Sequence, residues 1–160
     1  MSTVGAIATT TSGTVGRALQ VILTAGLICG VLDGLSALIV SGVGWLRLFQ
    51  YIASAILGPK SFQGGVSTAF LGIGLHFTIA LGASVVYYVA SRGLTFMVHQ
   101  ALLSGVLFGI AVHLFMRFIV VPASAIGHRP FVLRSFIVQM IVHMVVVGPS
   151  IALTIRHYSR

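Results

Sequence analysis

The sequence predicts an all-α membrane protein: four transmembrane helices in an antiparallel bundle plus one interfacial amphipathic helix. Two features of the composition indicate a membrane protein: 58% of the 160 residues are hydrophobic and only 6% are charged, whereas a soluble domain carries roughly 25% charged residues. Several apolar stretches are also long enough to cross roughly 30 Å of hydrocarbon as helices. They do not alternate like barrel strands. The length leaves room for one bundle and no soluble domain.

The four predicted spans cover residues 18–39, 66–90, 98–121 and 131–154. Residues 1–16 are rich in small and hydroxyl side chains, so we expect a mobile N-terminal tail before a single domain of residues 17–160. Arg17 and the apolar run after it are typical of a signal peptide, but the run is long and no clear small-x-small cleavage site follows. We therefore expect an uncleaved first span.

Residues 44–57 are apolar but too short to cross the membrane and return. On a helix, one side would carry Trp45, Phe49, Ile52 and Ile56, and the other Arg47, Gln50 and Ser54. This two-sided pattern favours a helix lying in the membrane interface, with a re-entrant or packed loop as the alternative.

Basic residues far outnumber acidic ones: the chain has nine basic residues and a single acidic residue, Asp33, for a net charge of +8. Eight basic side chains therefore have no acidic partner in the chain, and anionic membrane lipids are the expected partners. We do not expect nucleic acid binding, because the basic residues are scattered over both predicted membrane faces. They are divided too evenly between those faces to predict an orientation.

Three glycines in the first span, Gly26, Gly30 and Gly34, form a ridge of small residues along one helix face. Such a ridge lets another helix approach closely, either within the bundle or between copies of the chain. Asp33 projects only about 20° from Gly26 at 100° per residue. We therefore expect its carboxylate to point into a helix contact.

One ionisable side chain of each span falls at nearly the same depth, roughly 16 to 23 Å from the terminal side at 1.5 Å per residue. These residues are Asp33, His76, His113 and His143. An antiparallel bundle can bring them into one polar layer. Gln139 and Arg117, each one turn from a histidine of the layer, would support it.

Such a layer is compatible with three functions and with a purely structural role. Asp33 and three imidazoles can handle protons or ions, or bind a transition metal. The spacing of His99 from His113 and of His143 from His157 resembles the paired histidines of di-haem b-type membrane cytochromes. This resemblance implies haem levels at His113 with His143 and at His99 with His157. Alternatively, the layer serves only to pack the helices.

No nucleophile with its base, phosphate loop or zinc-protease motif is recognisable, so we expect no enzyme unless the layer holds a metal. The chain, in particular QYIASAILGPKSFQGG, GIGLHF and HMVVVGPSIAL, resembles small bacterial four-span membrane proteins without an established activity. The resemblance implies the four-span architecture only. We separately expect the protein to be located in the bacterial inner membrane. We expect such a protein to pack with itself or with a larger membrane complex.

Overall fold

The computed structural model describes the backbone of residues 3–159 and the side chains of residues 14–159. Every regular element in this part of the chain is helical. Four segments are long and apolar enough to cross a membrane: Thr14–Ser41, Gly65–Gly93, Ala101–Ala123 and Leu133–Tyr158. The predicted all-α membrane fold with four spans is confirmed.

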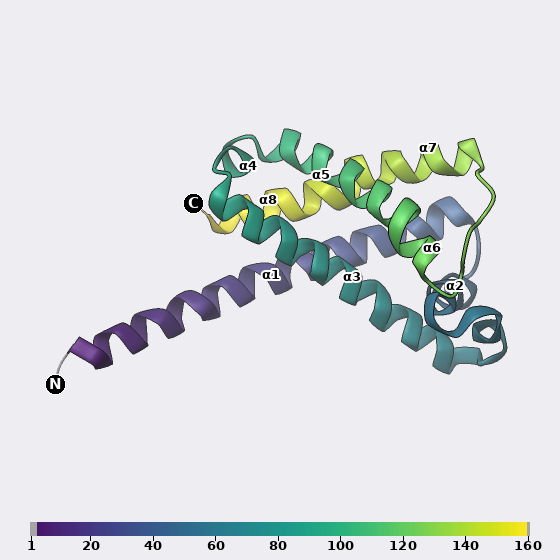
Figure 1. Cartoon of the computed structure of the whole chain (residues 1–160), viewed down its shortest axis with the longest axis horizontal. Helices are drawn as coiled ribbons and strands as arrows, with labels where there is room; N and C mark the ends of the chain where they lie inside the picture. Colours follow the sequence, from purple (N-terminus) through teal and green to yellow (C-terminus); the bar gives the residue numbers. More distant parts are fainter. Residues whose placement is uncertain (1–2, 160) are drawn as a thin grey trace.

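The helices follow one another along the chain with short connections (Figure 1). The α-helices are α1 Thr3–Ser41, α2 Trp45–Leu57, α3 Gly65–Gly93, α4 Phe96–His99, α5 Ala101–Phe115, α6 Val121–Ala123, α7 Leu133–Val142 and α8 Gly148–Tyr158. A 3-10 turn, η1 Gly58–Gln63, follows α2, and two π turns, η2 Met116–Val120 and η3 His143–Val147, join α5 to α6 and α7 to α8. The predicted tail is helical from Thr3 onward; its mobility stays a prediction.

Helix α2 occupies the predicted interfacial segment and lies across the end of the bundle, where Figure 1 views it nearly end-on. Two of the three polar residues on its polar side, Gln50 and Ser54, are buried against the protein, whereas Arg47 is exposed. Gln50 is only 3% exposed, and its amide Nε2 donates a hydrogen bond to the carbonyl of Gly65 at 3.0 Å. Burial of this amide is tolerated because it has a hydrogen-bond partner.

The third span begins later than predicted, at Ala101 instead of residue 98. Gln100 leaves the helical conformation, with φ −104° and ψ 44°, and this break separates the one-turn helix α4 from α5. His99 therefore belongs to α4 and does not share a continuous helix with His113. The predicted span of residues 98–121 is thus interrupted near its start.

Both π turns directly precede a residue followed by proline. The Val121 N–H donates to the Met116 carbonyl, and the Gly148 N–H donates to the His143 carbonyl, each five residues back. Pro122 and Pro149 come next and have no N–H to donate. The irregularity that Pro149 predicts in the fourth span thus takes the form of a wide turn, a feature often found at functional sites.

Glycines allow three close helix contacts. On α1, a methyl group added to Gly30 would lie 2.6 Å from the Phe77 ring of α3. On α3, a methyl at Gly72 would overlap the Phe49 carbonyl of α2. On α5, a methyl at Gly109 would overlap the His143 carbonyl. A methyl at Gly148 would likewise overlap the carbonyl of Gly105. These contacts define two groups of helices: α1 with α3 and α2, and α5 with η3 and α8.

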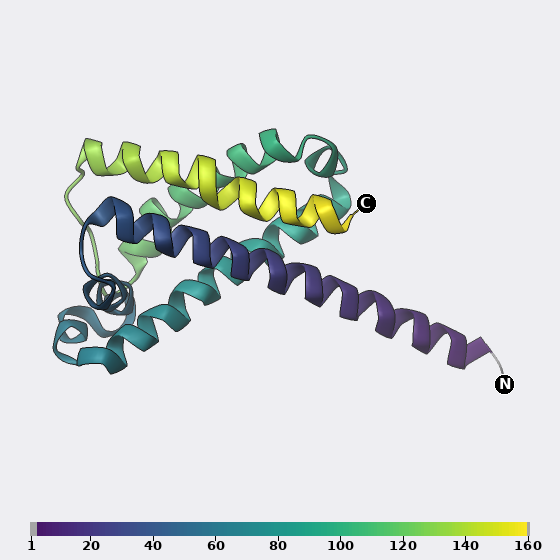
Figure 2. The same cartoon turned by 180° about the vertical axis from the view of Figure 1, so that it is seen from behind.

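The two groups join through α1 and α8, which lie side by side in Figure 2. A core of buried apolar residues fills this junction on the side of the chain termini. It comprises Val21, Ala25, Cys29, Ala80, Tyr87, Met97, Ala101, Val147, Ile151, Ala152 and Ile155. Away from this core, α3 and α5 diverge from their common end near α4 (Figure 1). The divergence leaves space in the other half of the bundle.

The glycine contact between α5 and η3 predicts a specific sensitivity to one methyl group. Gly109→Ala should lower the free energy of unfolding by about 1–3 kcal/mol, because backbone atoms must separate to admit the methyl. Gly82→Ala in α3 is the matched control, since nothing lies within 4 Å of its added methyl. Alanine there should be neutral or slightly stabilising. Thermal unfolding in detergent measures both, and equal effects would contradict this packing.

Candidate functional site

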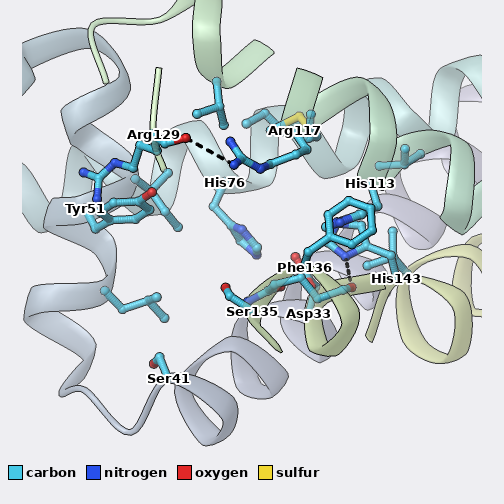
Figure 3. A pocket seen from close by; sticks show the side chains of 18 of the residues that line it. Asp33, Ser41, Tyr51, His76, His113, Arg117, Arg129, Ser135, Phe136 and His143 are labelled. Atoms are coloured by element: carbon cyan, nitrogen blue, oxygen red, sulfur yellow. Dashed lines mark hydrogen bonds between the residues drawn. The ribbon is translucent and has the colours of Figure 1, made fainter. Parts of the chain in front are cut away.

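A cavity of about 790 Å³ occupies the space between the two helix groups. All four residues of the predicted layer line it: Asp33, His76, His113 and His143. Gln139 and Arg117, the predicted supporting residues, line it as well. The cavity extends to the connections on the face opposite the termini, where Ser41, Arg47, Arg129 and Pro130 form its mouth. Figure 3 shows the polar side chains around this space.

Asp33 lies on α1, one turn beyond Cys29, and is half-buried in the cavity wall. At 1.5 Å per residue it stands about 12 Å below the end of α1. Among the described residues, no Lys, Arg or His side chain forms an ion pair with it. Its carboxylate therefore faces the cavity without a protein counter-charge in contact.

His76 crosses from α3 to α1. Its Nε2 donates a hydrogen bond to the carbonyl oxygen of Gly30 at 2.8 Å, so this nitrogen carries a proton. The ring is 9% exposed and stands edge-on to Phe49 and Phe77, with centroids 6.0 and 5.5 Å away. The ring also lies beside Gly34, where an added methyl would be 3.4 Å from Nε2. His76 thus contacts α1 along the glycine ridge while it lines the cavity.

His113 and His143 meet edge to face across the contact between α5 and η3, with ring centroids 5.0 Å apart and an interplanar angle of 61°. The Nδ1 of His143 donates to the Gln139 carbonyl at 2.8 Å. His113 is 6% exposed, and its buried Nε2 has no hydrogen-bond partner in the described part of the chain. A buried unpaired polar atom costs free energy and marks a place where a ligand or proton is expected.

Three arginines border the same cavity, and sequence reasoning did not assign two of them, Arg47 and Arg129, to the site. The Arg117 Nη2 donates to the carbonyls of Arg129 and Pro130 at 3.3 and 3.4 Å. The Arg129 guanidinium lies 4.9 Å from the Tyr51 ring centre, and Arg47 is equally close to the Phe62 ring. The only sequence signal was the basic, aromatic segment around Arg129. Arg47 and Arg129 come to the cavity because of how α2 and the α6–α7 connection fold.

The site does not fit a metal centre. A structural or catalytic zinc takes three or four protein ligands, and no group of three His, Cys, Asp or Glu side chains among the described residues is arranged to hold an ion. The four residues of the layer share a cavity but do not converge on one point. Their arrangement suits contacts with a larger ligand.

The site does not fit haem either. The His113 and His143 rings touch, and Gly109 brings the backbones of α5 and η3 into contact, so no flat macrocycle fits between these helices. His99 and His157 are both exposed, and neither lines the cavity. His157 instead packs edge-on against Tyr158. The spacing of fourteen residues therefore does not produce two ligand levels.

No family model, curated protein or solved structure matches the chain. The class of protein is therefore defined by the fold and the cavity alone. This is an integral membrane protein of four spans with a cavity between two helix groups that is lined by both charged and apolar side chains.

The position of the cavity can be checked by cysteine labelling in a Cys29→Ala background. Ser135→Cys should react readily with a membrane-impermeant charged thiol reagent, because Ser135 is exposed at the cavity. Ser84→Cys is the control, since Ser84 is fully buried between helices; it should react only after unfolding. Labelling of both at similar rates in the folded protein would contradict the closed core beneath the cavity.

Proposed function

We propose that this small multi-pass membrane protein binds an ion in the cavity, and that the ion is an anion. One observation supports the proposal above all others. Three arginines and three histidines line the cavity with a single carboxylate, Asp33, and the described residues around it form no ion pair.

The charge count favours an anion over a cation. With neutral histidines, three arginines and one aspartate leave a net charge of +2 around the cavity. Arginine stays protonated in proteins, and an unpaired charge at membrane depth is costly. A bound anion would offset that cost, whereas a bound cation would add to it.

The shape of the site favours binding over passage through the membrane. Between the cavity and the terminal face, the helices carry buried apolar side chains, such as Ala25 on α1 and Ile151 and Ile155 on α8. These residues separate the cavity from the polar side chains of the terminal face, such as Arg17 and Arg92. A cavity that is closed toward the terminal face is suited to capture a ligand.

Proton handling is a second candidate function, favoured by the unpartnered Nε2 of His113 beside His143. Histidine titrates near neutral pH, and Asp33 offers a carboxylate in the same cavity. Because apolar residues close the cavity toward the termini, protons would be taken up and released at one face. We propose that this proton exchange and anion binding occur at the same site.

The proposal also covers the membrane in which the protein lies and its neighbours there. We assign it to the bacterial inner membrane, with anionic lipids around the basic side chains. On helix α1, Leu19, Leu23 and Leu27 are exposed, whereas Val21 and Ala25 between them are buried. This exposed apolar side suits packing against another copy or a larger membrane complex, whereas the glycine ridge is used in contacts within the chain.

Arg117 provides the first test of anion binding. Phosphate or sulfate, compared with chloride at constant ionic strength, should raise the thermal unfolding midpoint of the purified protein. The stabilisation approaches about 2.7 kcal/mol at one hundred times Kd. Arg117→Gln should abolish most of it, while Arg134→Gln, a change of an exposed arginine outside the cavity, should not. Equal stabilisation of both variants would overturn the proposal.

Asp33→Asn tests the electrostatics of the site in the opposite direction. Removing the only negative charge of the cavity should tighten anion binding several-fold, since roughly 1 kcal/mol of repulsion is lost at partly hydrated distances. A titration of the purified variant with phosphate measures the change in Kd. A purely structural layer predicts unchanged binding and lower stability instead. In proteoliposomes, a proton flux unaffected by this substitution would remove Asp33 from the second candidate function.

A further inference from the structure

We infer that the anion is the phosphate headgroup of a membrane lipid, which enters the cavity sideways between α3 and α5. This inference rests on the proposed anion site and names its ligand. Four features of the cavity support it: a lateral opening, a division into a cationic mouth and apolar walls, its size, and the way the arginines are held.

The lateral opening follows from the packing of the helices. Helix α3 packs on α1 and α2, and α5 packs on η3 and α8. Helices α3 and α5 touch on the terminal side, where the Tyr87 and Ser104 hydroxyls share a hydrogen bond and Tyr87 stands edge-on to Phe108, and they have few backbone contacts with each other. The side chains that line the cavity from these two helices are largely apolar: Ile79, Ala80 and Ala83 on α3, and Val112 on α5. Both helices are spans, so a gap between them faces the hydrocarbon of the bilayer.

The cavity has two chemically different parts. Arg47 on α2 and Arg129 in the α6–α7 connection lie at the end of the bundle, the level of lipid headgroups. Arg117 stands about 9 Å below the end of its span, at 1.5 Å per residue. Ala83, Cys29 and Val147 line the deeper part and are apolar. An amphiphile with an anionic head and an acyl chain matches this order from mouth to depth.

The size of the cavity also favours an amphiphile over an inorganic ion. Its 790 Å³ lies within the range of about 300–1,000 Å³ typical of sites for organic ligands. A free phosphate would fill only the part near the arginines and leave the apolar walls without contacts. An acyl chain would cover those walls.

The arginines keep donors available for a phosphate. The guanidinium groups of Arg47 and Arg129 rest on the faces of Phe62 and Tyr51, which holds each plane while leaving its N–H edge free. Arg117 contacts two carbonyls through Nη2 at long distances of 3.3 and 3.4 Å, so its other nitrogens remain available. Guanidinium and phosphate can then form two parallel hydrogen bonds.

Lipid retention measured by native mass spectrometry tests this inference. The full chain is reconstituted in an equal mixture of phosphatidylglycerol and phosphatidylcholine with identical acyl chains, then transferred to detergent. We expect retained phosphatidylglycerol to exceed phosphatidylcholine by roughly tenfold, and Arg117→Gln to remove that preference, as expected for loss of a charge-assisted hydrogen bond. Arg134→Gln should keep the preference.

A second variant separates the lipid from a free anion. Ala83→Phe places a large side chain at the apolar wall of the cavity, away from the arginines. It should lower lipid retention several-fold while leaving the Kd for inorganic phosphate unchanged. The unchanged phosphate Kd also reports that the variant is folded.

The other outcomes overturn either the lipid inference alone or the proposed anion site as well. Phosphate binding that depends on Arg117, without preferential lipid retention, would overturn the lipid inference and leave the anion site standing. Equal retention of both lipids in every variant would mean ordinary boundary lipid and would also overturn the inference. Absence of both phosphate and lipid binding would overturn the proposed function as well.

Discussion

The close approach of helix backbones at glycine determines the rest of this structure. Gly72 lets α2 lie directly on α3, and Gly109 brings α5 onto the wide turn η3. In a membrane, apolar surface gains little by leaving lipid, so close van der Waals contact is a main source of helix association. Because the glycines lie at particular points, the helices pack tightly in two groups and not evenly around one axis. The polar cavity is the space between these groups.

The electrostatics of the cavity follow from the same arrangement. The α2 helix and the α6–α7 connection meet at the end of the bundle, where the Ala125 N–H donates to the Ala55 carbonyl at 2.9 Å. This contact brings Arg129 near the arginines of two other segments. Each positive charge is supported by an aromatic ring or by backbone carbonyls. The sole carboxylate is then one component of a cationic site and not its centre.

The fold was predictable because composition and apolar length decide it, and the four side chains that the depth count selected line one cavity. The count could not give their distances, which depend on helix tilt and on where α3 and α5 diverge. The break at Gln100 has no proline or glycine to signal it, so His99 was assigned to the wrong helix. The burial of Gln50 could not be predicted, because its hydrogen-bond partner, the Gly65 carbonyl, is fifteen residues away in the chain.

The π turn at His143–Val147 has a consequence for the register of the fourth span. A turn with one extra residue rotates everything after it by about 100° relative to a regular α-helix. Polar residues before and after the turn, such as Gln139 and Thr154, therefore belong to two separate helical phases, although a helical wheel puts them on one stripe. Deleting a single residue in this turn would restore one phase and turn Gly148 away from Gly105. The fourth span thus consists of two short helices that are rotated relative to each other about the helix axis. The number of residues in the span is therefore itself a structural requirement.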